Sequence, residues 1–336
     1  MEACDKFRKW EELIPDALGL IFKNLTLLEM LTVVPRVCKS WGKVVKGPYC
    51  WQEIDIEEWS KGCKPDTLDR MIEMLITRSC GSLRKLAVSN LSNDQSFLFI
   101  EKHAQSLRAL RLPRSEITDP IMARAAISLS SLTSLDISYC IRVGARGLEA
   151  VGRACRFLTS LRRVMHPLEV VGKPSQDDEA LAVAANMPRL RHLEIAYLLV
   201  RTHSVVEIIK NCKDLELLDV RGCWDVNLEE GFLKGFVGLR VVGPVVVDCY
   251  DVCSEFSGSS GYLAWDFVAG EGLNGDDEDD DDDDDWYGYD DDDDVYGGMM
   301  GHDDDDDDGG SMEDVEMWFY DDVDAVDAGY DWPQSP

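Results

Sequence analysis

The N-terminal stretch alternates hydrophobic and polar positions at helical spacing. Between Trp10 and Trp51 the hydrophobic residues recur at steps of three and four, the period of an amphipathic helix. Pro15 followed by Asp16 is a typical helix start, because proline fits the first turn and a carboxylate there complements the helix dipole. Pro35 predicts a break, since proline disfavours helical geometry at the residue before it. The pattern therefore predicts about three short helices, too small a unit to bury a full core without a partner surface.

Beyond Trp51 a second pattern predicts a repeat of one strand and one helix. The motif L-x-x-L-x-[LVI] returns along the chain, and its first leucines are 24, 25, 29, 29, 25 and 24 residues apart. Leucine-rich repeats of about 20–29 residues have this form, and stacking buries the leucines that one unit cannot bury alone. The motifs lie at Leu83-Leu86-Val88, Leu107-Leu110-Leu112, Leu132-Leu135-Ile137, Leu161-Val164-His166, Leu190-Leu193-Ile195 and Leu215-Leu218-Val220, and the pattern fades at Leu239-Val242.

The same spacing predicts individual elements. An alternating run over 51–56 indicates a strand, and 65–79 indicates a helix that begins with proline. An inserted loop over 168–178 precedes a helix expected over 179–186. His166 stands at a leucine position, so its repeat is either distorted or its strand is misassigned.

The N-terminal stretch carries three further motifs: Leu13-Ile14-Pro15-Asp16, the stripe Ile21-Phe22-x-x-Leu25, and Val37-Cys38-Lys39-Ser40-Trp41 with the trailing Trp51. In these motifs it resembles an F-box. In that family the helices pack on a Skp1-like adaptor, which links them to a cullin-RING ubiquitin ligase. A generic three-helix bundle is the alternative. The resemblance implies an adaptor contact made by Leu13, Ile14, Pro15, Leu18, Ile21, Phe22, Leu25, Val37, Cys38 and Trp41.

We therefore expect an α/β protein in three parts. A three-helix F-box covers 6–51, a leucine-rich-repeat solenoid covers 52–253, and a disordered Asp-rich tail covers 254–336. In such a solenoid parallel strands form the concave face and helices the convex face. The repeats, two of them flanked by cysteines, resemble those of plant F-box proteins with leucine-rich repeats.

Residues between the strand leucines are candidates for binding a target protein. They are expected to point out of the concave face, where they mix charges of both signs and form no phosphate cradle. For each of them the alternative is a solvated side chain that contacts no partner. The candidates are Arg111, Asp136, Ser138, Arg163, Met165, Glu194, Asp219 and Arg221.

Charged residues are distributed unevenly, so the chain has two regions of different composition. The formal net charge is −31, from 65 acidic and 34 basic residues. No Lys or Arg follows Arg240, and 32 of the acidic residues lie in 254–336, which leaves 33 acidic against 34 basic residues before it. Blocks of like charge repel and stay disordered. The tail is a solvating segment, a polyanion that docks weakly on a basic protein, or a segment that folds over the chain's own arginines.

Several other chemistries find no support in the sequence. The 11 cysteines include no CxxC pair, and a zinc site of Cys249 and Cys253 with His166 or His203 lacks the usual spacing. Reduced, buried thiols and the absence of a secretory pattern indicate the nucleus or the cytoplasm. No apolar run is long enough to span a membrane.

No catalytic or cofactor motif is recognisable, and no direct contact with nucleic acid is expected. The resemblance implies a non-catalytic substrate-recognition subunit of an SCF-type ubiquitin ligase, which binds the adaptor through the F-box and a target through the repeats. The alternative is a non-ligase acidic repeat protein that shields a basic partner, such as a histone or nucleic-acid-binding protein.

Overall fold

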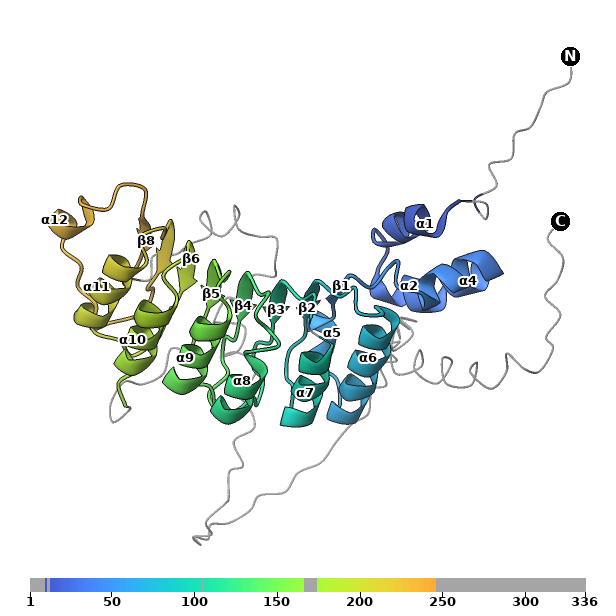
Figure 1. Cartoon of the computed structure of the whole chain (residues 1–336), viewed down its shortest axis with the longest axis horizontal. Helices are drawn as coiled ribbons and strands as arrows, with labels where there is room; N and C mark the ends of the chain where they lie inside the picture. The colour runs from blue at the N-terminus through green and yellow to red at the C-terminus, as the bar shows by residue number, and fades with distance from the viewer. Residues whose placement is uncertain (1–9, 11–12, 104, 166–173, 246–336) are drawn as a thin grey trace, which may run out of the picture. The chain divides into compact units, whose positions relative to one another are not determined.

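The computed structural model describes residues 10, 13–103, 105–165 and 174–245 (Figure 1). Its first helix begins as the sequence predicts, with Pro15 in the first turn, and the structure shows a capping box of Thr26 and Glu29 at the start of the next. The break predicted at Pro35 is not found there, because Val33 is helical and Val34 begins a helical segment in which Pro35 occupies the first turn. The extended residue is Cys38, so four helical segments form three helices. The segments are α1 (Pro15–Phe22), α2 (Leu27–Thr32), α3 (Val34–Val37) and α4 (Lys39–Lys46).

The rest of the described chain alternates strands and helices. The strands form one parallel sheet in the order β1 to β8, each paired with its neighbour in sequence. They are β1 (Glu53–Asp55), β2 (Lys85–Ala87), β3 (Ala109–Arg111), β4 (Ser134–Asp136), β5 (Ser160–Arg162), β6 (His192–Glu194), β7 (Leu217–Asp219) and β8 (Arg240–Val242). The helices are α5 (Glu57–Ser60), α6 (Pro65–Arg78), α7 (Asp94–Lys102), α8 (Asp119–Ala125), α9 (Ala145–Ala154), α10 (Asp177–Asn186), α11 (Thr202–Asn211) and α12 (Glu230–Leu233).

Helices α6 to α11 lie side by side along one face of the sheet (Figure 1). We call the opposite face the open sheet face. The middle residue of each strand points toward the helices, and Leu86, Leu110 and Leu135 are at most 1% exposed. The predicted architecture of parallel strands and packed helices is confirmed.

Cysteine thiols join successive repeats inside this core. Cys140 donates to the carbonyl of Leu112 at 3.1 Å, and Cys223 donates to that of Ile195 at 3.2 Å. Burial raises the pKa of both thiols to about 12. These cysteines are therefore packing residues that stay protonated near neutral pH.

One repeat was misassigned from the sequence. Leu161 pairs with Leu135 across β4 and β5, so it is the second leucine of its motif and not the first. The motif is Leu158-x-x-Leu161-x-Arg163, with arginine where the other repeats carry an aliphatic residue. Because hydrophobicity alone defines the pattern, the charged residue shifted the predicted register by three positions.

Arg163 is consequently buried on the helix side of the sheet instead of pointing out of the open sheet face. It is 1% exposed, and its Nε lies 3.1 Å from the Glu179 carboxylate. Its remaining nitrogens donate to the carbonyls of Val143 at 2.6 Å and Ile137 at 3.3 Å. These contacts satisfy a charge that would otherwise be costly to bury.

Polar side chains form hydrogen bonds between adjacent repeats near the N-termini of their helices. Asp119 in the first turn of α8 accepts from the backbone N–H groups of Gly144 at 2.8 Å and Gly147 at 2.9 Å. Thr202 accepts in the same way from the N–H of Asn227 at 2.8 Å. The bond to Gly147 satisfies a donor that α9 leaves unpaired in its first turn, and the bond to Asn227 holds the turn that precedes α12.

The remaining predicted elements are found close to their expected bounds. The strand over 51–56 is β1, the helix over 65–79 is α6, and the helix over 179–186 begins two residues earlier as α10. The fading motif at Leu239-Val242 contains β8. His166, most of the inserted loop, Cys249, Cys253 and the acidic tail lie outside the described residues.

Candidate protein-binding surfaces

Helix α1 has a buried face and an exposed face. Leu18 and Phe22 are 0% and 1% exposed, and Phe22 packs edge-on against Trp41 with ring centroids 5.0 Å apart. A Cβ on Gly19 would lie 2.7 Å from the carbonyl oxygen of Tyr49, so this face makes a close approach to the chain that follows α4. The inner face of α1 thus holds the N-terminal helices together.

The outer face of α1 leaves hydrophobic side chains in solvent. Ile14 is 65% exposed and Ile21 is 42% exposed, and they lie two helical turns apart on one side of the helix. Leu13, Leu25 and Val37 are exposed as well. We call Leu13, Ile14, Leu20, Ile21, Leu25, Val33 and Val37 the apolar helix face.

Five of the ten sequence-predicted adaptor residues belong to this face, and five do not. Of these five, Pro15 is exposed in the first turn of α1 but is not one of the large hydrophobic side chains that define the face. Leu18 and Phe22 are buried in the chain's own core and offer no surface for a partner. Cys38 is half-buried between α3 and α4, not within a helix, and Trp41 is half-buried against Phe22. Leu20, 65% exposed, and Val33, 56% exposed, were missed.

The apolar helix face is dense compared with the rest of the described surface. Of the 15 large hydrophobic side chains that are exposed among the described residues, 8 lie between Trp10 and Val37. Clusters of this kind mark interaction sites in soluble proteins, whereas single exposed hydrophobic residues are normal.

The open sheet face carries a row of paired charges instead. Arg111 on β3, Asp136 on β4, Arg162 on β5 and Glu194 on β6 occupy the same register position on adjacent strands. The ion-pair distances along this row are 3.7 Å from Arg111 to Asp136, 3.8 Å from Asp136 to Arg162, and 2.9 Å from Arg162 to Glu194. At one end Glu57 lies 2.8 Å from Arg111. We call these five residues the charge row.

Side chains on either side fill in this face. Asp219 forms a bidentate pair with Arg221, whose Nη2 lies 2.6 Å from the carboxylate. Ser138 donates to Asp136 at 2.6 Å. Burial raises the pKa of Glu57 and of Glu194, and the neighbouring Arg111 and Arg162, respectively, oppose that shift. The charged side chains of this face are thus paired mainly with one another.

The predicted target-binding residues are therefore only partly available. Asp136, Ser138, Met165 and Asp219 are buried, and Arg163 lies on the other side of the sheet. Arg111, Glu194 and Arg221 remain partly exposed. Arg162 was missed because the register of its repeat was misassigned.

The described residues contain no group of three or more side chains able to hold a metal ion. None of their helices is long and apolar enough to cross a bilayer.

Comparison with known proteins identifies the family. No family model matches the chain. F-box protein FBW2 of Arabidopsis thaliana is 52% identical over 286 residues, covering 82% of this chain and 90% of that protein. The chain belongs to the F-box protein family.

Further relatives support the repeats. F-box protein SKIP19 is 31% identical over 80% of this chain and 86% of its own length, and putative F-box/LRR-repeat protein 23 is 31% identical over 66% of this chain and 50% of its own length, both from Arabidopsis thaliana. The yeast Rad7–Elc1 crystal structure aligns with a TM-score of 0.30 and 13% identity, over 68% of this chain and 75% of that one, too low a score to argue from. The chain is thus a plant-type F-box protein with leucine-rich repeats, a class that serves SCF-type ubiquitin ligases as receptor subunits.

Proposed function

We propose that this F-box protein is a non-catalytic substrate receptor that binds a Skp1-like adaptor through the apolar helix face. The observation that carries the proposal is the set of exposed hydrophobic side chains on α1 to α3, led by Ile14 and Ile21. Covering these side chains removes apolar surface from water, which favours association by about 25 cal/mol for each Å² buried. Through the adaptor the chain would join a cullin-RING ligase.

The open sheet face is the proposed surface for the target protein, which would be ubiquitinated and degraded. Its charge row offers Arg162 and Glu194 with partly exposed side chains, at 25% and 32%. A target that satisfies these groups gains orientation, because charges at an interface select partners more than they add affinity. We further propose that the protein acts in the nucleus, the cytoplasm, or both.

Co-expression with a Skp1-like adaptor tests the proposal. The full chain should co-elute with the adaptor in size-exclusion chromatography, and Ile14→Ala with Ile21→Ala should abolish co-elution, because loss of two anchor side chains costs about tenfold or more in affinity. The matched control is Ile127→Ala with Ile141→Ala, which truncates residues 77% and 70% exposed on the repeats. Equal behaviour of the two double variants would contradict the assignment of the apolar helix face.

The acidic tail favours one competing function. A chain that shields a basic protein would use the 32 acidic residues of 254–336 and would not need the apolar helix face. Failure of the wild-type chain to co-elute with the adaptor, together with salt-sensitive binding to a basic protein such as a histone, would favour that function.

A further inference from the structure

The turns that lead from each helix into the next strand carry an excess of positive charge. Histidine aside, the charged residues in the turns before β2 to β8 are seven cations and two carboxylates, Asp214 and Glu216, and Arg240 opens β8. All of these cations are exposed. We call the following residues the basic rim: Arg84, Arg108, Arg156, Arg189, Arg191, Lys213, Lys234 and Arg240.

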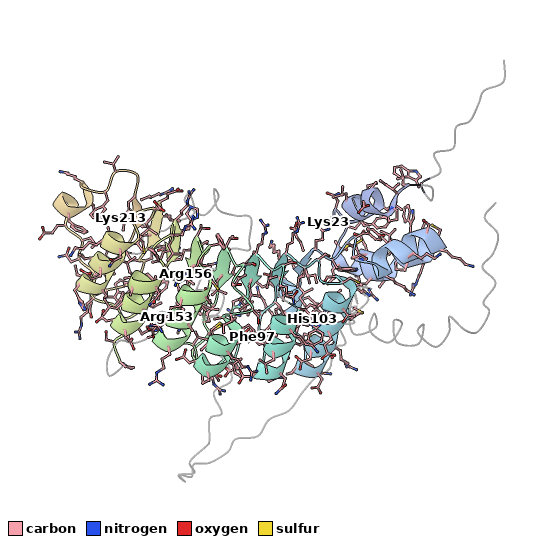
Figure 2. The ribbon with its side chains drawn as sticks, in the orientation of Figure 1. Lys23, Phe97, His103, Arg153, Arg156 and Lys213 are labelled. Atoms are coloured by element: carbon pink, nitrogen blue, oxygen red, sulfur yellow. The ribbon has the colours of Figure 1, made fainter. Side chains whose placement is uncertain are left out.

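Backbone hydrogen bonds align part of this rim in one row. The N–H of Arg108 donates to the carbonyl of Arg84 at 2.8 Å, and further bonds of 2.8 Å continue through Thr133, Thr159 and Arg191. The row goes on through Glu216 to Arg240, again with bonds of 2.8 Å. Neighbouring strands are about 4.8 Å apart, so the side chains follow one another along the edge of the sheet. Figure 2 labels Arg156 and Lys213 in the turns that precede β5 and β7.

The basic rim differs from the opposite edge in how its charges are matched. In the turns that follow the strands, Arg142 pairs with Glu116 at 2.8 Å and Arg201 with Asp177 at 3.8 Å. On the rim Arg191 pairs with Glu216 at 3.5 Å. Among the described residues, by contrast, no carboxylate forms an ion pair with Arg84, Arg108 or Arg156. The rim therefore has guanidinium groups ready for an external anion.

An aromatic side chain stands within the rim. Phe157 is 59% exposed, and the guanidinium carbon of Arg189 lies 5.9 Å from the centre of its ring. Aromatic residues and arginine are enriched at protein interfaces, where a few of them supply most of the binding free energy. Phe157 and Arg189 thus provide an apolar anchor beside the unpaired charges.

We propose that the basic rim binds a carboxylate-rich segment of a partner protein. Guanidinium groups fit carboxylates in bidentate pairs, and the rim supplies seven arginines or lysines beside Arg240. A nucleic acid fits less well, because nucleic-acid-binding domains carry an excess of positive charge. Outside the tail this chain has 33 acidic against 34 basic residues, and the net charge of the whole chain is −31. Because the rim shares no residue with the apolar helix face, this inference does not depend on adaptor binding.

Fluorescence anisotropy with the full chain tests the proposal. The probe is a labelled peptide of glutamates with a single leucine, and the comparison peptide carries glutamine in place of glutamate. The glutamate peptide should bind and weaken with added salt, and Arg84→Gln with Arg108→Gln should reduce its affinity about fivefold. Arg124→Gln with Arg146→Gln, which removes the same charge from exposed positions on α8 and α9, should leave the affinity unchanged.

Three results would overturn the proposal. The first is no binding of the glutamate peptide, and the second is an equal loss in both double variants, which would reflect net charge alone. The third is tighter binding of a single-stranded RNA oligonucleotide that is lost in the Arg84→Gln, Arg108→Gln variant, because the rim would then be a nucleic-acid site. Loss of adaptor co-elution in a separate experiment would bear only on the proposed receptor function.

Discussion

The N-terminal helices expose hydrophobic side chains, whereas the open sheet face carries charged side chains that pair with one another. At the N-cap and on the outer face of α1, Ile14 and Ile21 are 65% and 42% exposed. On the sheet, Asp136 sits between Arg111 and Arg162, and its side chain is only 7% exposed. Burying an exposed apolar face favours binding to any apolar surface of complementary shape. A charge row that is already paired favours only a partner whose charges match its own. The helices are thus suited to a constant partner and the sheet to a selected one.

The repeats depend on polar groups even inside their core, and removing one of these should have the largest effect on stability. Arg163→Met should lower the free energy of unfolding by about 3–5 kcal/mol, because it strands the buried carboxylate of Glu179. Urea denaturation followed by circular dichroism measures this. Arg163→Met with Glu179→Leu should recover part of the loss, and Arg156→Met, at an exposed position, should be neutral. A neutral Arg163→Met would show that the pair does not hold the repeat.

Within α1 the two faces should separate stability from binding. Leu18→Ala should cost about 3 kcal/mol of unfolding free energy, because Leu18 is fully buried. Ile14→Ala should change stability by less than about 0.5 kcal/mol while weakening adaptor binding. Thermal unfolding and calorimetric titration with the adaptor distinguish the two variants. Equal stability losses would mean that the outer face is packed in solution.

The side-chain hydrogen bonds between repeats should contribute less to the free energy of unfolding. Asp119→Ala removes the acceptor for the N–H groups of Gly144 and Gly147 and should cost about 1 kcal/mol. Asp66→Ala, which removes an exposed first-turn carboxylate from α6, is the matched control and should cost only a few tenths of that. Urea midpoints of the two variants provide the test, and equal midpoints would show that the hydrogen bonds of Asp119 do not stabilise the repeats.

The buried thiols should make the repeats lose stability in alkali. Burial raises the pKa of Cys140 and Cys223 from the ordinary 9.0 to about 12. Above pH 9 the unfolded chain ionises these thiols while the folded chain keeps them protonated, so stability falls as the pH rises toward 12. Urea midpoints at about pH 8 and about pH 10 measure the slope. Cys140→Ala with Cys223→Ala should reduce the slope, part of which remains because burial also raises the pKa of Cys50, Cys155 and Cys212 to about 11. An unchanged slope would assign the loss to other groups.

The sequence predicts the architecture well because burial leaves a periodic trace. The leucines at Leu86, Leu110 and Leu135 are spaced by the repeat itself, so their pattern gives the strands and their order. The same method fails at Arg163, since a charged residue in an aliphatic position breaks the only signal that the pattern uses.

The candidate surfaces were harder to predict. Helical spacing finds a hydrophobic stripe on α1 but does not say which side meets the core. The predicted contact therefore includes Leu18, which is buried, and omits Leu20, which is 65% exposed. The charge row joins side chains from different repeats, such as Glu57 and Arg111, which no local pattern relates. Once the register is known, however, Arg162 falls into this row by alignment alone.

Hydrogen–deuterium exchange of the full chain, with and without a Skp1-like adaptor, tests most directly that the apolar helix face binds the constant partner. The adaptor should slow exchange in peptides covering 13–37 and leave exchange in peptides covering β2 to β8 unchanged. Protection confined to the repeats, with none in the helices, would contradict this assignment.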